Sequence, residues 1–192
     1  MTATALALTP LPTPSLYEGV LGPAWAQLPA LVRRMHEEGS ASGHFTIWRS
    51  TGLLSALLGW LCRFPAAGEG VATRLRVRRD GEAQRWERDF GGHRLTTLQR
   101  AWEGGRIGEK LGPVECVFRF EAVQASLVYQ QVGAWLCVGP WRLRLPRLAA
   151  PRIEATTTAA PEGMRVLVKI GAPLLGWLLT YDGLVSPEET AS

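Results

Sequence analysis

The chain has 192 residues and a formal net charge of +4, with 46% apolar and 20% charged residues. This length fits one domain, and the composition is too apolar for a disordered chain. The chain contains three cysteines and its glycines follow no fixed period, which excludes a disulfide scaffold and a collagen-like protein.

The cysteines indicate a reducing compartment. Cys62, Cys116 and Cys137 show no paired spacing and are odd in number, so we expect free thiols and a cytoplasmic protein. The N-terminus lacks the charged and apolar regions of a signal peptide. The longest apolar run, 53–62, is about half the roughly twenty residues of a spanning helix, so no transmembrane segment is expected.

The first residues predict an arm followed by helices. Residues 1–14 carry three prolines, which remove backbone donors and favour a disordered arm. Ser15 and Glu18 form a capping-box pattern at the start of a helix. Gly22-Pro23 interrupts that helix, and apolar residues then recur at helical spacing until Gly39, with Pro29 expected to kink the second helix or to start a third.

The run 52–62 is apolar on nearly every side. A helix of this kind normally lies in a core. We therefore expect it to be buried against a sheet or to cover the mouth of a barrel.

Downstream of Pro65 the apolar period changes from 3.6 to 2. In 71–79, Val71, Thr73, Leu75 and Val77 alternate with arginines, and Asp80-Gly81 supplies a tight turn. Similar runs give about nine or ten short strands from residue 44 onward with no helix between consecutive strands, which excludes a doubly wound parallel sheet. The prediction is one α+β domain over 15–187, with N-terminal helices packed on a strongly curved antiparallel sheet or β-barrel, and a frayed tail at 188–192.

Arg88 has an unusual position in this pattern. Counting by twos places it on the same face as Trp86 and Phe90. A guanidinium pointing into an apolar interior needs an anionic partner, from either a protein carboxylate or a ligand head group. The other interpretation is that a bulge turns Arg88 outward or that its stem reaches water.

Searches for familiar chemistry find no established type of site. There is no phosphate-binding glycine loop, no nucleophile elbow and no metal-ligand spacing among His36, His44 and His93. We therefore expect neither a cofactor nor a metal. Carboxylates such as Glu115 and Glu121 alternate away from the aromatic residues and are expected to be solvated.

Two further features leave their interpretation open. The stretch 71–106 holds nine arginines against five acidic residues, which fits either a solvated strand face or a surface that meets phosphates or an anionic membrane. The segment LLGWL occurs at 57–61 and again at 174–178, either as core or as a contact with a bilayer interface. The arginines are not interleaved with aromatic residues as in a nucleic-acid-binding module, so we expect no nucleic acid.

Six motifs follow one another along residues 15–187. They are Leu16-Tyr17 with Leu21-Gly22 and Trp25 to His36, then Gly52 to Pro65, Trp86 to Gly92, Leu111 to Pro113, Leu143 to Pro151, and Pro173 to Gly183. In this order they resemble a bacterial family catalogued as a domain of unknown function, the group numbered four-one-six-six, whose members occur alone or joined to dehydrogenase-like Rossmann domains. Because no Rossmann motif is present here, the resemblance implies a separate dehydrogenase-like protein as a partner, and it implies no catalytic residue.

These observations favour a non-catalytic module that binds a small apolar or amphipathic ligand in the concave side of the sheet. The candidate lining residues are Trp86, Arg88, Phe90, Phe118, Tyr129 and Trp177. Two alternatives stay open. One is an enzyme, isomerase-like or accessory to a dehydrogenase, that acts on a hydrophobic substrate in the same cavity; the other is a module that docks on a membrane surface or a protein through the basic stretch and the LLGWL segments.

Overall fold

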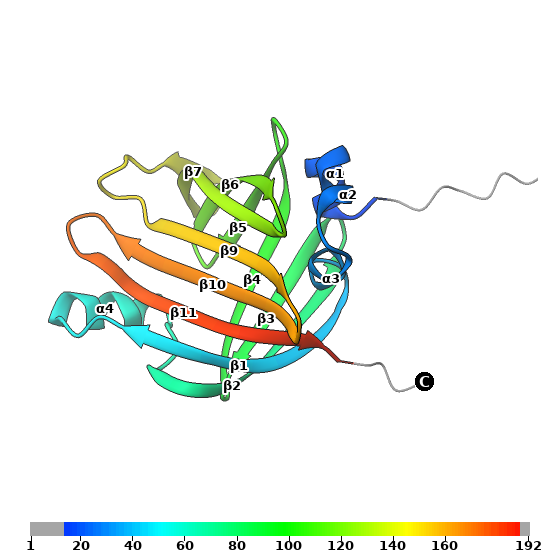
Figure 1. The fold of residues 1–192 in the computed structure, drawn as a ribbon. Helices are drawn as coiled ribbons and strands as arrows, with labels where there is room; N and C mark the ends of the chain where they lie inside the picture. Colours follow the sequence, from blue (N-terminus) through cyan, green and yellow to red (C-terminus); the bar gives the residue numbers. More distant parts are fainter. Residues whose placement is uncertain (1–13, 189–192) are drawn as a thin grey trace, which may run out of the picture.

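The computed structural model describes residues 14–188, and its dominant feature is a ring of antiparallel strands (Figure 1). The predicted arm at 1–14 and the tail beyond Glu188 lie almost entirely outside the described residues. Eleven strands form one sheet with the order β6-β5-β4-β3-β2-β1-β11-β10-β9-β7-β8, and β6 also pairs with β7. That extra pairing closes ten of the strands into a barrel, which confirms the predicted fold class.

The strand bounds follow the predicted alternation. The strands are β1 (Gly39–Arg49), β2 (Gly68–Asp80), β3 (Ala83–Phe90), β4 (His93–Trp102), β5 (Arg106–Leu111), β6 (Val114–Val123), β7 (Ser126–Val138), β8 (Trp141–Arg144), β9 (Arg152–Ala160), β10 (Gly163–Ala172) and β11 (Gly176–Pro187). Alternate residues of each strand point into the ring, where most of the buried apolar side chains gather.

Three short helices lie across one end of the barrel. They are α1 (Leu16–Leu21), α2 (Pro23–Gln27) and α3 (Ala30–Met35). The capping box of Ser15 and Glu18 forms at the start of α1, and Pro29 is the N-cap of α3, so the proline starts a third helix. The prediction that the helix runs to Gly39 is wrong, because α3 ends at Met35 and Gly39 already belongs to β1.

The helices reach strands from several sides of the ring. α1 contacts β4, α2 contacts β6, and α3 contacts β1, β9 and β10. Tyr17, Trp25 and Val32 of the helices and Leu28 between α2 and α3 are at most 4% exposed, so this segment closes that end of the barrel.

The fourth helix, α4 (Leu53–Leu61), lies at the opposite end of the barrel (Figure 1). The expectation that this segment is buried against the sheet is wrong for most of its side chains: its buried residues are Ser55 and Gly59 and Leu58 packs against the core, whereas its other large apolar side chains are exposed. In a closed barrel the inner faces of the strands already pack against one another. The sheet therefore offers no surface that could bury a nine-residue apolar helix on every side. No helix among the described residues is long and apolar enough to cross a bilayer.

The contact between the first and the last strand depends on Gly43. A Cβ atom at this position would lie 1.8 Å from the carbonyl oxygen of Leu184 and 2.9 Å from the Cα of Val185. We expect Gly43→Ala to lower the free energy of unfolding by about 2 kcal/mol, because β1 and β11 must move apart. Urea unfolding measures the effect. Gly19→Ala in α1 is the control: a Cβ there meets no heavy atom within 4 Å, so stability should stay equal or rise by up to about 1 kcal/mol. Equal losses for the two variants would contradict this account of the β1–β11 contact.

Candidate functional site

One edge of β7 changes partner along its length. Residues 126–130 pair with β9, whereas residues 135–138 pair with β8. Where β7 leaves β9, an opening of about 1060 Å³ lies between β7, the segment 144–156 and the turn that joins β10 to β11. We call it the wall opening.

A side-chain amide spans the point where the strands separate. Gln131 Nε2 donates to the carbonyl oxygen of Pro151 at 2.8 Å, and its Oε1 accepts from the backbone amide of Ile153 at 2.8 Å. The side chain thus replaces the backbone ladder over this step and satisfies groups that the separation leaves free. It fixes one margin of the wall opening.

The lining of the wall opening combines small apolar residues with a basic margin. Its apolar part is Ala134, Leu145, Ala150, Ile153, Ala155 and Ala172. Its basic part is Arg144, Arg147 and Arg152, against the single carboxylate of Glu154, which pairs with Arg152. Such a lining suits a molecule with an apolar body and an anionic group.

Inside the barrel, Tyr129 and His36 are joined by a hydrogen bond. The Val32 carbonyl lies 2.7 Å from Nδ1 of His36, and because a carbonyl only accepts, Nδ1 carries the proton. Nε2 therefore accepts from the Tyr129 hydroxyl at 2.8 Å. The pKa of His36 is lowered to about 4, mainly by burial and to a smaller extent by the positive charge of Arg88, while the bond to Val32 acts in the opposite direction. His36 is neutral at pH 7.

Tyr17 brings the helices into the same network. Its hydroxyl donates to Oε1 of Gln99 at 2.8 Å and lies 3.4 Å from the hydroxyl of Tyr129. Burial raises the pKa of both tyrosines, so both hydroxyls stay protonated at neutral pH. The network is a set of neutral hydrogen-bonding groups.

Arg88 points into the barrel and has a protein carboxylate as its partner. Its Nη2 lies 3.3 Å from Oε1 of Glu109, and its Nη1 donates to Thr97 Oγ1 at 2.8 Å. Thr97 in turn donates to Oε1 of Glu109 at 2.6 Å. Of the two interpretations of Arg88, the inward one is therefore correct. The Arg88 and Glu109 side chains stay 16% and 18% exposed, so the interior around them is not completely filled.

The sequence-predicted lining residues divide into two groups. Trp86, Phe90 and Phe118 are buried inside the barrel, at most 4% exposed, and Arg88 lies over the Trp86 ring at 5.3 Å. Tyr129 lies inside as well and also lines the wall opening. Trp177 is apart from the others: it lines the outer part of the opening, where Arg152 and Lys169 lie 4.7 Å and 5.8 Å from its ring.

Sequence reasoning missed four polar members of the interior. Glu109 and Gln99 could have been found by the same counting that placed Arg88, because Glu109 shares its strand face with Ile107 and Leu111, and Gln99 shares its face with Thr97. Tyr17 and His36 carry no such signal. Helical spacing indicates which face of a helix is apolar. It does not indicate that the side chains of that face enter the end of a barrel.

Glu115 corrects an expectation of solvent exposure. Its side chain is fully buried on the outer face of β6, and it pairs with Arg100 at 2.8 Å and with Arg142 of β8. The rings of Trp102 and Trp135, 4.9 Å apart, flank it. Alternation correctly gave the face of Glu115, but β8 and the two tryptophans cover that face. This cluster fastens β8 to the barrel.

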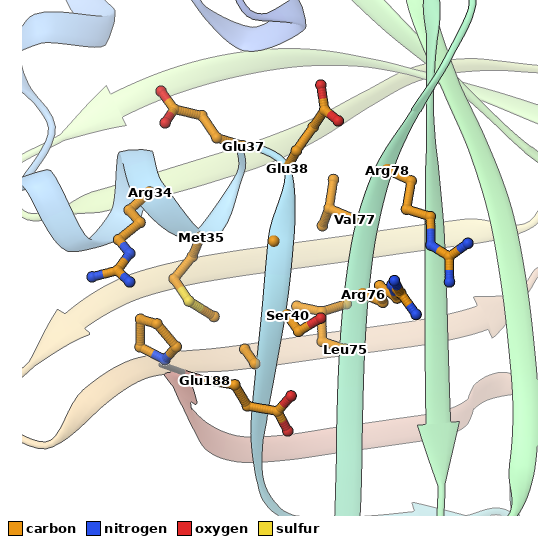
Figure 2. Close-up of a pocket in the computed structure, with 13 residues that line it drawn as sticks. Arg34, Met35, Glu37, Glu38, Ser40, Leu75, Arg76, Val77, Arg78 and Glu188 are labelled. Carbon is orange, nitrogen blue, oxygen red and sulfur yellow. The ribbon is translucent and has the colours of Figure 1, made fainter. Parts of the chain in front are cut away.

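A second hollow, of about 620 Å³, lies between α3, β1 and β2 at the helical end. Figure 2 shows that its charged side chains do not converge: the carboxylates of Glu37 and Glu38 extend away from the guanidinium groups of Arg76 and Arg78. The hollow has charges of both signs around its margin and no shared focus. The wall opening is the better candidate site.

A comparison with models of known protein families assigns the chain to a family. The profile of the family described as "Domain of unknown function (DUF4166)" matches residues 28–185, which is most of the chain. The chain belongs to this family. The DUF4166 match covers β1 to β10, nearly all of β11, and the helices α3 and α4, so both the barrel and the wall opening are parts of the family domain. Neither the curated proteins nor the solved structures gave a match.

The buried His36 predicts a pH-dependent stability. Its pKa is about 4 in the folded protein and about 6.5 in the unfolded chain, so the unfolded chain binds more protons between these values. The contribution is fully present above pH 6.5 and is lost as the pH falls toward 4, by about 1.4 kcal/mol per pH unit. Urea unfolding across this range should show a smaller loss for His36→Gln than for the wild type. His44→Gln changes an exposed histidine on β1 and should keep the wild-type slope. Identical slopes in all three proteins would refute the prediction.

The Arg88–Glu109 ion pair inside the barrel predicts that removal of the Glu109 charge strongly lowers the stability of the fold. Glu109→Gln leaves the Arg88 guanidinium without an anion in a mostly buried site, so we expect a loss of about 3 kcal/mol in the free energy of unfolding. Glu121→Gln is the control, because it removes the carboxylate of an exposed ion pair: the Glu121 side chain is 43% exposed and that of its partner Arg119 is 60% exposed. This variant should lose less than about 1 kcal/mol in the free energy of unfolding. Thermal or urea unfolding compares the two variants, and a comparable small loss in both would show that Arg88 does not depend on Glu109.

Proposed function

We propose that the barrel is a non-catalytic module that binds a small amphipathic ligand through the wall opening. The apolar part of the ligand lies against the small residues of β7 and β9. Its polar group meets the Tyr129 hydroxyl or the arginines of the margin. The volume of the opening, about 1060 Å³, is at the upper end of what small-molecule pockets offer.

The observation that carries the proposal is the double position of Tyr129. Tyr129 is one of the residues that line the wall opening, and its hydroxyl belongs to the buried hydrogen-bond network of His36 and Tyr17. A molecule bound in the wall opening therefore lies beside a residue that is part of this fixed polar network. This is the usual composition of a ligand pocket, in which a few polar groups orient a mostly apolar molecule.

Two buried polar atoms near this network support the proposal. Among the described residues, Nε1 of Trp86 and Oε1 of Gln84 have no hydrogen-bond partner. Trp86 packs against both Tyr17 and His36, and Gln84 donates to the backbone carbonyl of His36. Buried polar groups without a partner cost free energy, so a polar ligand atom reaching them would be stabilised.

The network favours binding over proton transfer. Both ring nitrogens of His36 are engaged, Nδ1 with Val32 and Nε2 with Tyr129. The pKa of His36 is lowered and those of the tyrosines are raised, which moves all three away from neutral pH. A general acid or base works best with a pKa near the working pH.

The free thiols of Cys62, Cys116 and Cys137 support a reducing compartment, the cytoplasm, as the place of this function.

Titration with a fluorescent fatty acid, dansyl-labelled undecanoic acid, tests the proposal. The wild type should bind it saturably. Ala155 lies on the inner face between Tyr129 and Val168, so Ala155→Trp should fill the opening and weaken binding at least about ten-fold. Tyr129→Phe keeps the ring but removes the hydroxyl, and it should weaken binding about five-fold, the value of one hydrogen bond.

Ala125→Trp is the matched control, because Ala125 is exposed in the turn after β6 at the helical end. It should bind like the wild type. Circular dichroism shows whether each variant keeps its fold. No saturable binding by the wild type, or wild-type affinity in a folded Ala155→Trp variant, would overturn the proposal.

A further inference from the structure

Helix α4 turns its large apolar side chains mostly toward solvent and its small residues toward the barrel. Its buried residues are Ser55 and Gly59, whereas Leu53, Leu54, Leu57, Trp60 and Leu61 are between 52% and 93% exposed. These five recur at helical spacing and form one outward stripe. Surface helices of globular proteins normally turn such a stripe toward the core, so this one marks a candidate contact surface within residues 14–188.

The orientation of α4 is fixed by its small inward residues. Ser50 Oγ donates to Ser55 Oγ at 3.1 Å, and a Cβ atom at Gly59 would lie 2.1 Å from a guanidinium nitrogen of Arg49. The glycine lets the guanidinium of Arg49, the last residue of β1, lie directly against the helix. If the helix rotated to turn its leucines inward, their bulky side chains would occupy the space in which Ser55 and Gly59 now fit.

A second segment exposes an apolar side chain at the same end of the barrel. Leu174, in the turn between β10 and β11, is 96% exposed and has a φ of +67°. This conformation disfavours residues with a Cβ, so both the backbone and the side chain are in costly states. Arg49 pairs with Leu179 and Gly171 with Trp177, which places this turn at the α4 end (Figure 1). We call the five residues of α4 together with Leu174 the apolar rim.

The charge beside the apolar rim is positive. Arg63 follows α4 directly, and Arg144 and Arg147 lie on the margin of the wall opening; all three are exposed. Within residues 14–188 none of them forms an ion pair. Apolar side chains beside unpaired arginines match an interface of acyl chains and anionic head groups.

The basic stretch 71–106 lacks the apolar part of this surface, because none of its large apolar side chains is exposed. Its Arg74, Arg76 and Arg79 are exposed without an ion pair within residues 14–188, whereas other arginines of the stretch are paired. Arg78 pairs with Glu87, Arg85 with Asp80, and Arg94 with Asp89. The second LLGWL segment also differs from the first, because Leu178 is buried and Leu174 is its one exposed large apolar residue. The surface that the sequence pointed to is thus only partly the surface that the fold offers.

We propose that the apolar rim docks the α4 end of the barrel onto an anionic lipid bilayer. Leu and Trp side chains of α4 and Leu174 insert among the head groups, and Arg63, Arg144 and Arg147 face the anionic lipids. The docking rests on the rim alone and does not require the proposed function. If both hold, the wall opening faces the lipid from which an amphipathic ligand would enter.

Flotation with lipid vesicles tests the docking. Vesicles of phosphatidylcholine mixed with phosphatidylglycerol should carry the wild type at low ionic strength, and added salt should weaken the binding. Vesicles of phosphatidylcholine alone should carry much less. Replacing one arginine, in Arg63→Gln or Arg147→Gln, should weaken partitioning about five-fold.

Single substitutions on the rim have matched controls at the helical end. Leu57→Glu should weaken vesicle binding at least about ten-fold, whereas Val123→Glu changes a similarly exposed residue, 48% against 57%, at the end of β6 and should bind like the wild type. Arg79→Gln, an exposed arginine beside the β2–β3 turn, is the control for the arginine variants. Since these side chains are exposed, the variants are expected to fold.

Three outcomes overturn the docking. They are no binding of the wild type to anionic vesicles at low ionic strength, wild-type binding by Leu57→Glu, and a wild-type dimer that Leu57→Glu converts to a monomer without any vesicle binding. The last outcome would assign the rim to contact with a second copy. Ligand titration of Leu57→Glu in the absence of vesicles separates the two proposals, because the wall opening is unchanged in this variant.

Discussion

A β-strand has two edges, and the use of both edges of β7 determines this structure. One edge pairs with β6 along the strand and closes the ring. The other edge is divided between β9 and β8, so the wall cannot be continuous where the partner changes. The opening follows from that division, and the Gln131 side chain bridges the one place where neither partner strand supplies the hydrogen bonds. Closure of the barrel and access to its interior are therefore two consequences of one strand's pairing.

The interior combines an ion pair, neutral hydrogen bonds and aromatic packing. Arg88 and Glu109 come from β3 and β5, with Thr97 of β4 between them, so the charged pair ties three adjacent strands together. Tyr17 and His36 extend the polar contacts to the helices. Buried polar groups add little net stability, but they disfavour other arrangements in which they lack partners. The helices are thus held to one position at the end of the barrel.

Two-residue alternation predicted the strands and the inward face of Trp86, Arg88 and Phe90, because in a barrel the inner face is also the buried face. It failed for Glu115, since alternation gives the face of a residue and not what later segments of the chain lay over that face. Hydrophobicity failed for α4 for a related reason: it measures how much a segment gains from leaving water, but not whether the fold has room for it. The Tyr129–His36 contact joins residues 93 positions apart in the sequence, and no local pattern encodes it.

The pairing of β1 with β11 has a consequence for biosynthesis. The chain emerges from the ribosome N-terminus first, and the strand that covers one edge of β1 is the last to be made. Until then the nascent chain presents unprotected edges at β1 and at each newly made strand, the state in which β-proteins are most prone to associate wrongly. Completion of the ring must therefore be a late, long-range event, and chaperone protection would matter most during the interval before β11 has left the ribosome.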